Sequence, residues 1–267
     1  MSNRVITLLT DFGVKDYFVG AMKGVILARS PGSVLVDITH EIPAHDIHTA
    51  AFTLNAAYAW FPPGSIHLAI VDPGVGSDRR PILVEAAGHL FVGPDNGLFS
   101  LVTDQYPSAQ IRHLTRCDYF QPEPSTTFHG RDVFAPVAAS LANGTSPEEF
   151  GPIIDDPVRL EPMQFESLPD GSARGRILHI DRFGNCVTNL PSDLFPVTAE
   201  TRPFVLQVKE CTVQTLERSY KASALHPNLP FLIRGSAGFL EISLSSFSAE
   251  RAFGISVADP VCLVWRS

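Results

Sequence analysis

A change in hydrophobic period near residue 150 constrains the fold of this chain more than any other feature. Before that point, short β-branched runs alternate with segments in which apolar residues recur every three or four positions. Strands that alternate with helices form a mostly parallel sheet, which helices cover on both faces. We therefore predict an α/β domain over residues 1–152. Its expected strands are 4–9, 34–38, 66–71, 82–86 and 90–92, and its expected helices are 16–29, 46–61, 97–102 and 132–142.

The periodicity fades between Pro152 and Ser172, where proline and acidic residues accumulate. This composition is typical of a segment between domains, so we predict a linker over residues 153–172. The remainder of the chain has short strand-like runs separated by turn residues, with almost no helical pattern. We predict that residues 173–267 form a small all-β domain, an antiparallel barrel or sandwich, with strands at 177–180, 204–208, 231–233, 239–244 and 261–265.

Charge and composition limit the possible partners. The chain has 20 lysines and arginines against 28 aspartates and glutamates, a net charge of −8. This balance argues against binding nucleic acid or an anionic membrane through a basic face. Charged residues make up 18% of the chain, below the roughly 25% of typical proteins. We therefore expect a small-molecule partner, no nucleic acid, and some surface buried between subunits.

No apolar run approaches the roughly 18 residues that a membrane span requires. The first apolar run, which begins at Arg4, is short and strand-like and does not resemble a signal-peptide core. We expect a cytoplasmic protein with no membrane partner. The four cysteines form no CxxC pair, so we expect reduced, buried thiols at Cys117, Cys186, Cys211 and Cys262.

Three loops follow the first three predicted strands: Thr10–Gly13, Thr39–Pro43 and Asp72–Arg80. Open α/β sheets bind ligands outside the carboxyl ends of their strands, so these loops are expected to meet at one crevice. The third loop is rich in glycine but lacks the Gly-Lys-Ser/Thr of a P-loop, and the chain has no GxGxxG fingerprint. Nucleotide phosphates are therefore not indicated.

One acid, one guanidinium and one imidazole are expected near this crevice: Asp72, Arg79 and His129. Together these groups can deprotonate or orient a water molecule. Gly130 removes a side chain beside His129, which we expect to leave room for a substrate. A single carboxylate at a strand end, such as Asp11 or Asp72, can also serve only to form a turn.

Five motifs occur in order along the chain, and together they identify a resemblance. The chain resembles the S-adenosyl-L-methionine (SAM) hydroxide adenosyltransferase family, which is related to the bacterial fluorinase and chlorinase. The resemblance extends over nearly the whole chain. The motifs are Thr10-Asp11-Phe12-Gly13, Val71-Asp72-Pro73-Gly74-Val75-Gly76 with Arg79-Arg80, Gly93-Pro94-Asp95-Asn96-Gly97, Phe128-His129-Gly130-Arg131-Asp132 and Ile180-Asp181-Arg182-Phe183-Gly184-Asn185.

The resemblance implies an α/β domain, a β-barrel domain and a homotrimer whose sites lie between subunits. It also implies attack by water or hydroxide on C5′ of SAM, giving adenosine and methionine. Asp72, Arg79 and His129 match the family's water-activating triad, which the halogenating relatives lack. SAM is then the substrate, and neither a cofactor nor a metal is expected, because the thioether leaves as a neutral group. Either Asp72 or His129 could take the proton.

The binding roles implied in the α/β domain fall on two acids. Asp11 matches a carboxylate that holds both ribose hydroxyls, a task that suits one acid accepting two hydrogen bonds. Asp16 matches a residue near the methionine end of the substrate, although it could equally cap the helix that follows.

The β domain supplies the remaining implied contacts. Asp181 matches a contact to the methionine amino group and Asn185 a contact to adenine, and Phe183 lies in the same motif. A simple turn is the alternative for this segment. Ser236 matches one member of a Ser-Arg pair near the methionine carboxylate, but Ala237 replaces the arginine.

Two other functions stay open on the sequence alone. The cluster His40, His45, Asp46 and His48 could bind a metal and make the protein a metal-dependent hydrolase of another substrate, although its spacing matches no HExxH pattern. Alternatively, the protein could be a sensor that binds SAM or a nucleoside without turnover. Such a binder gains nothing from an acid and a histidine that face C5′.

Overall fold

The computed structural model describes residues 4–161, 164–195, 202–220 and 228–266. The start of the chain before Arg4 and part of the predicted linker therefore lie outside the described residues. The chain forms two compact units, Met1–Glu161 (unit 1) and Pro162–Ser267 (unit 2). The boundary falls inside the segment that we predict as a linker.

Unit 1 is built on a six-stranded sheet with the strand order β2-β1-β3-β5-β4-β6. Its strands β1, β2, β3 and β5 pair in parallel, while β4 pairs antiparallel with β5 and β6. The sheet is therefore mixed, and the mostly parallel arrangement is not confirmed. The strands are β1 (Val5–Thr10), β2 (Val34–Thr39), β3 (Ile66–Ile70), β4 (Pro81–Ala86), β5 (His89–Pro94) and β6 (Gln110–His113).

A tight hairpin explains the antiparallel pair. Only Ala87 and Gly88 connect β4 to β5, and their φ angles of 54° and 76° suit a two-residue hairpin turn. A parallel neighbour would need a crossover of about a dozen residues. We did not predict β6, which forms the edge strand beyond this hairpin.

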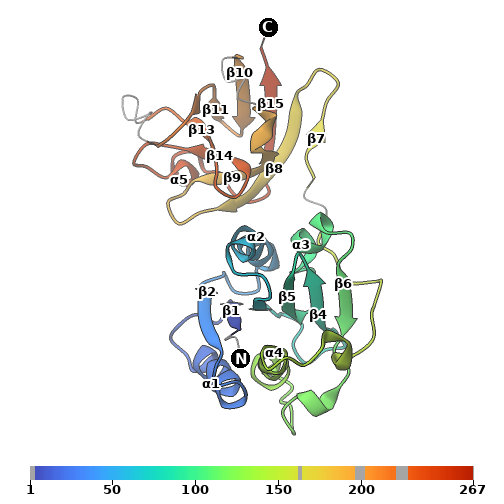
Figure 1. Ribbon diagram of the computed structural model, residues 1–267. Helices are drawn as coiled ribbons and strands as arrows, with labels where there is room; N and C mark the ends of the chain where they lie inside the picture. The colour runs from blue at the N-terminus through green and yellow to red at the C-terminus, as the bar shows by residue number, and fades with distance from the viewer. Residues whose placement is uncertain (1–3, 162–163, 196–201, 221–227, 267) are drawn as a thin grey trace. The chain divides into compact units, whose positions relative to one another are not determined.

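Helices cover both faces of the unit 1 sheet, as predicted (Figure 1). Helices α1 (Phe18–Arg29) and α4 (Ala135–Ala142) pack together on one face, over apolar side chains of β1 and β3. Helix α2 (Ile47–Ala57) and the short α3 (Ser100–Gln105) contribute to a second apolar cluster on the other face. Each face is thus closed by apolar burial, which leaves the strand ends for polar side chains.

The N-termini of α1 and α2 differ in how they are capped. The Asp46 carboxylate accepts the Thr49 N–H at 2.9 Å and so caps α2. The prediction that Asp16 caps α1 is wrong, because Tyr17 occupies the N-cap position without a side-chain bond. Asp16 instead lies exposed one residue earlier.

Unit 2 is a curled, largely antiparallel sheet with the order β11-β10-β15-β8-β9-β14-β13-β12, and β7 pairs with β8. No ladder joins β11 to β12 among the described residues, so this unit is a half-barrel and closure into a full barrel is not confirmed. The elements are β7 (Glu166–Ser167), β8 (Ala173–Ile180), β9 (Cys186–Pro191), β10 (Phe204–Val208), β11 (Cys211–Val213), β12 (Leu216–Glu217), β13 (Phe231–Arg234), β14 (Phe239–Ser243), α5 (Ala249–Phe253) and β15 (Pro260–Trp265).

The four cysteines are all free thiols, as predicted. Cys186 and Cys211 are buried in the unit 2 sheet, which raises the pKa of the Cys211 thiol to about 11. Cys117 is exposed and Cys262 is only partly buried, so the prediction of a buried thiol is wrong at these two positions.

Candidate active site

The loop that follows β3, residues 72–80, brings Asp72 and Arg79 into direct contact. Arg79 Nε donates to Asp72 Oδ1 at 2.9 Å, and Arg79 Nη2 donates to Asp72 Oδ2 at 2.5 Å. Both side chains are less than a tenth exposed. A planar guanidinium fits a carboxylate through two such bonds, so each side chain fixes the orientation of the other.

His129 completes this cluster from a distant part of the chain. Its Nδ1 lies 2.9 Å from Arg79 Nη2. Because a guanidinium can only donate, Nδ1 accepts, and the neutral ring therefore carries its proton on Nε2. Burial and the Arg79 charge lower the pKa of His129, against smaller opposing effects of Asp72 and Asp132.

Arg79 also retains an N–H group that no other group uses. Its Nη1 is buried and has no hydrogen-bond partner within the part of the chain that the structure describes. A buried donor without a partner carries a desolvation cost of about 1–3 kcal/mol. An oxygen atom of a bound molecule would remove that cost.

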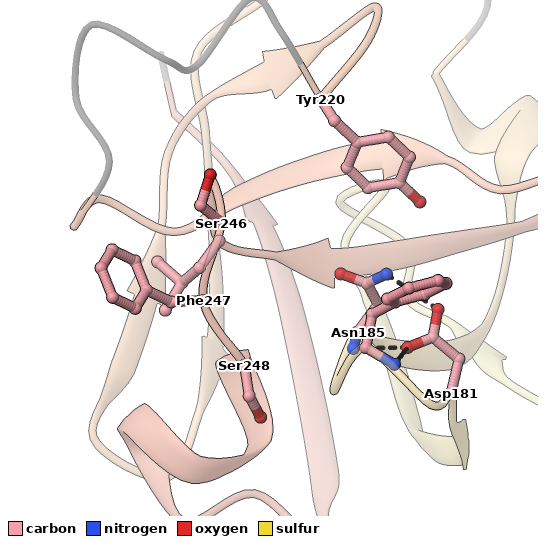
Figure 2. A pocket seen from close by; sticks show the side chains of 8 residues that line it. Asp181, Asn185, Tyr220, Ser246, Phe247 and Ser248 are labelled. Atoms are coloured by element: carbon pink, nitrogen blue, oxygen red, sulfur yellow. Dashed lines mark hydrogen bonds between the residues drawn. The ribbon is translucent and has the colours of Figure 1, made fainter.

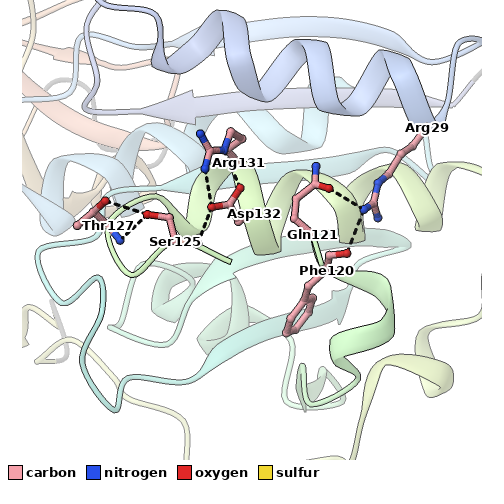
Figure 3. A network of polar contacts seen from close by, with 7 residues as sticks. All are labelled: Arg29, Phe120, Gln121, Ser125, Thr127, Arg131 and Asp132. Atoms are coloured by element: carbon pink, nitrogen blue, oxygen red, sulfur yellow. Dashed lines mark hydrogen bonds and ion pairs between the residues drawn. The ribbon is translucent and has the colours of Figure 1, made fainter. Parts of the chain in front are cut away.

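A network of polar contacts holds the segment that presents His129 (Figure 3). Arg131 Nε donates to the buried Asp132 carboxylate at 2.6 Å, and the same carboxylate accepts the Ser125 N–H at 2.8 Å. Arg29 reaches from α1 to the Phe120 carbonyl, at 3.0 Å. His129 therefore stands at the start of an anchored helical turn, Gly130–Phe134, that leads into α4.

Gly130 does not leave the open space that we expected. A Cβ on this residue would lie 3.2 Å from both Met22 Sδ and the Phe128 ring, and 3.4 Å from Ile70. The absent side chain thus allows the His129 segment to pack closely against α1 and β3. Gly130 therefore allows close packing and does not make room for a substrate.

Asp11 lies at the carboxyl end of β1, where its Oδ2 accepts the His45 N–H at 2.9 Å. His45 adopts a φ of 67°, in the left-handed region. One carboxylate oxygen of Asp11 therefore ties the first loop to the second, at the same edge of the sheet as Asp72. Asp16 lies in the same loop but is exposed.

Unit 2 contains a pocket of about 490 Å³ (Figure 2). Tyr220 lies on the same side of it as Asp181 and Asn185, and Phe247 lies on the opposite side. Phe183 is 77% exposed and Phe247 is 59% exposed. The pocket thus presents aromatic surface beside two polar side chains; its lining is Asp181, Phe183, Asn185, Tyr220, Leu244, Ser246, Phe247 and Ser248.

Asp181 shapes the turn on which these residues stand. Its Oδ1 accepts the N–H groups of Phe183 and Asn185, at 2.8 and 2.9 Å. Its Oδ2 accepts the Asn185 side-chain amide at 2.8 Å. The turn that we kept as an alternative therefore exists, and it is part of the pocket wall.

Sequence reasoning did not identify Tyr220, Phe247 or Ser248 as pocket residues. Strand pairing brings Phe247 and Ser248 there, because β9 pairs with β14 and Cys186 lies opposite Ile242. Tyr220 follows β12, which joins the same sheet through β13. No spacing in the sequence indicates that pairing. Ser236, in contrast, lies exposed in the turn between β13 and β14 and does not line the described pocket.

The candidate metal cluster does not assemble. The Asp46 carboxylate caps α2, and His40 Nδ1 lies 2.8 Å from Thr10 Oγ1. His45 and His48 are exposed. Within the described ranges, no group of three or more His, Cys, Asp or Glu side chains could hold a metal ion.

Comparison with known proteins places the chain in a family. Models of the SAM hydroxide adenosyltransferase N-terminal and C-terminal domains match residues 6–151 and 175–262. The chain belongs to the SAM hydroxide adenosyltransferase family. A protein from Methanocaldococcus jannaschii, named (R)-S-adenosyl-L-methionine hydrolase, is 34% identical, over 98% of this chain and 96% of that protein.

Two further proteins are similar to this chain, one in sequence and one in structure. A fluorinase from Actinoplanes sp. is 25% identical over 70% of this chain and 72% of its own length. The crystal structure of an uncharacterized conserved protein from Thermotoga maritima matches this chain with a TM-score of 0.89. The match covers 97% of this chain and 99% of that chain, with 31% sequence identity. No helix among the described residues is long and apolar enough to span a membrane.

Proposed function

We propose that this protein hydrolyses SAM to adenosine and L-methionine. The observation that carries the proposal is the contact of Arg79 with both Asp72 and His129, in which one buried guanidinium N–H group keeps no partner among the described residues. Curated relatives that match nearly the whole chain are named (R)-S-adenosyl-L-methionine hydrolase, which supports the same reaction here.

The reaction balances without a cofactor. A water molecule loses one proton to the solvent, and the resulting hydroxide attacks C5′. A C–O bond forms, and the C5′–S bond breaks with its electron pair going to sulfur. The negative charge of hydroxide and the positive charge of the sulfonium sulfur cancel, so neither charge is present in the products. A site that excludes bulk water favours this loss of charge, because it stabilises the separated ions less than water does.

The geometry favours a specific division of labour among the three residues. Arg79 Nη1 and the Nε2–H group of His129 are donors suited to hold a hydroxide. Asp72 holds the guanidinium in place through two bonds. In this arrangement His129 donates to the nucleophile, because its Nδ1 is already occupied by Arg79 and is not free to take a proton.

Substrate contacts are divided between the units. We assign the ribose hydroxyls to Asp11, the methionine amino group to Asp181, and adenine to Asn185 with Phe183. Unit 1 carries the triad and unit 2 the aromatic pocket. We propose a homotrimer in which the site joins unit 1 of one subunit to unit 2 of another. Contacts of Asp16 and Ser236 with the methionine end stay predictions, as does the cytoplasmic location.

We further propose that the substrate has the (R) configuration at sulfur. The curated relatives carry this prefix in their name. The words adenosyl and L-methionine already define the other stereocentres, so the prefix describes the sulfonium sulfur. Separate assays of the two sulfonium epimers test this point, and faster hydrolysis of the (S) epimer would contradict it.

Isotope labelling tests the reaction directly. In oxygen-18 water, we expect the label in the 5′-hydroxyl of adenosine, with no metal or nucleotide added. Unlabelled adenosine, or 5′-methylthioadenosine as the product, would exclude attack by water at C5′. The control is the same assay with chloride or fluoride, which should not give a halogenated nucleoside at a comparable rate.

A further inference from the structure

The turn at residues 94–97, between β5 and α3, contacts both ends of the 72–80 loop. At the start of the loop, the Asn96 side-chain amide donates to the Val71 carbonyl at 2.8 Å. At its end, the Asp95 N–H donates to the Arg80 carbonyl at 2.9 Å. The two contacted residues directly precede Asp72 and directly follow Arg79. One short turn therefore contacts the chain at both ends of the segment that carries these two side chains.

The Asp95 side chain strengthens the contact at the end of the loop. Its Oδ2 accepts from Arg80 Nε at 2.8 Å, and its Oδ1 accepts the Val158 N–H at 2.8 Å. The Asp95 side chain is only 2% exposed. The Arg80 guanidinium also donates to the Asp156 side chain and carbonyl, both at 2.7 Å. Arg80 thus links the loop to the last segment of unit 1 through partners that Arg79 does not use.

The turn itself is held in one conformation. Asn96 Oδ1 accepts the Leu98 N–H at 3.2 Å, so the same side chain that contacts Val71 also closes the turn. Gly97 has a φ of 95°, and a Cβ there would lie 2.9 Å from Leu160. A turn with this packing keeps its conformation, so it can hold the neighbouring loop in one position.

We propose that Asp95 and Asn96 are positioning residues for catalysis, which together form a clamp on the 72–80 loop. The clamp fixes the distance between Asp72 and Arg79, so that Arg79 can contact Asp72 and His129 at once. The inference rests on the proposed function, since it assigns catalytic value to that contact. A displacement of about 1 Å in a reacting group can cost about a hundredfold in rate.

An asparagine elsewhere in unit 1 provides a matched control. Asn143 donates its side-chain amide to the Arg29 carbonyl, also at 2.8 Å, at the end of α4. Asn143→Ala removes the same kind of bond without touching the loop. We expect Asn96→Ala to lower kcat by about 10- to 100-fold with KM changed less than about threefold, and Asn143→Ala to leave both nearly unchanged.

Two more variants separate positioning from folding. Asn96→Asp keeps the oxygen that accepts the Leu98 N–H but loses the donor to Val71, and Asp95→Asn weakens the Arg80 contact at the other end. Both should lower kcat while the thermal midpoint stays near that of Asn143→Ala. In an Asp72→Asn background, Asn96→Ala should cost little further, because a residue that acts through Asp72 has no additional effect once Asp72 is gone.

An NMR titration of His129 tests the contact without any turnover. The charged groups that act on this ring are Arg79, Asp72 and Asp132. If Asn96→Ala lets Arg79 move away, the pKa of His129 should rise, whereas Asn143→Ala should leave it unchanged. Normal kcat in Asn96→Ala, or a reduced kcat with an unchanged His129 pKa, would overturn the clamp. A wild-type protein that does not hydrolyse SAM would refute the proposed function, while the titration would still decide whether the clamp holds Arg79.

Discussion

The 72–80 loop of unit 1 and the 181–185 turn of unit 2 use aspartate in different ways. Asp72 binds a cationic side chain through both oxygens and is almost fully buried. Both carboxylate oxygens of Asp181 accept hydrogen bonds from N–H groups of its own turn. The first carboxylate positions charge, whereas the second builds the shape of a pocket wall. The same residue type therefore binds a guanidinium in one unit and shapes a turn in the other.

Aromatic residues show the same contrast. In unit 1, Phe134 is fully buried, and the Arg79 guanidinium lies 5.2 Å from the centre of its ring. In unit 2, Phe183 and Phe247 are largely exposed at the pocket. The aromatic side chain at the unit 1 cluster is already buried, while the pocket in unit 2 has apolar surface left to cover.

The largest effect should come from the unit 1 cluster. Asp72→Asn and His129→Ala should lower kcat by about 10² to 10⁴-fold with little change in affinity, because their role lies in the transition state. Steady-state kinetics and calorimetric titration with adenosine measure the two quantities. Asp11→Ala is the contrasting variant, in which affinity should weaken because the ribose anchor is lost. Near-normal turnover in folded Asp72→Asn would contradict the assigned roles.

Mixing two inactive variants tests whether the two units act across a subunit boundary. Asp72→Ala and Asn185→Ala should each be nearly inactive as pure trimers. After random subunit exchange in a 1:1 mixture, about one quarter of the sites combine an intact unit 1 with an intact unit 2. Activity should recover toward that fraction. No recovery in trimers verified by mass spectrometry would place the whole site within one subunit.

A smaller effect is expected from the exposed aromatic surface of unit 2. Phe183→Ala should raise KM by roughly tenfold, since stacking of a base on an aromatic ring contributes about 1–3 kcal/mol. Its thermal midpoint should hardly change, because the side chain is 77% exposed. Trp60→Ala is the control, an exposed aromatic of unit 1 at which neither kinetics nor stability should respond. A large loss of stability in Phe183→Ala would assign that ring to the fold instead.

The smallest effects concern the pH dependence of stability, which should have opposite sign in the two units. Burial and neighbouring His89 lower the pKa of His67 to about 3. The unfolded chain then binds the extra proton first, so stability is lost as pH falls from about 6.5 toward 3. Burial raises the pKa of Glu241, so the folded state keeps that proton longer and stability is lost as pH rises above about 4.5.

Melting curves at pH 4.5 and 7.5 separate these two contributions. His67→Phe should reduce the loss of thermal midpoint at pH 4.5, and Glu241→Gln should raise the midpoint mainly at pH 7.5. If both variants shift the midpoint equally at the two pH values, neither group carries the pH dependence.

Local pattern predicted most elements of unit 1 because each helix and strand there has its own apolar period. The prediction missed β6, because that strand is short and half polar. It also did not show that the turn Ala87-Gly88 makes β4 and β5 antiparallel. In unit 2 the runs at 204–208 and 239–244 correspond to β10 and β14. We missed β9, because Thr188 and Asn189 interrupt its apolar pattern although both are buried.

The sequence by itself determined the alternation of elements, the change of hydrophobic pattern between the two units and the identity of the residues that can carry charge or protons. These follow from local hydrophobic period and from side-chain chemistry. Only the tertiary structure decided that Arg79 contacts His129, that Gly130 serves close packing, and that Asn96 reaches Val71. Such contacts join residues 25 to 108 positions apart, and their geometry depends on how whole strands and helices pack, which no local pattern encodes.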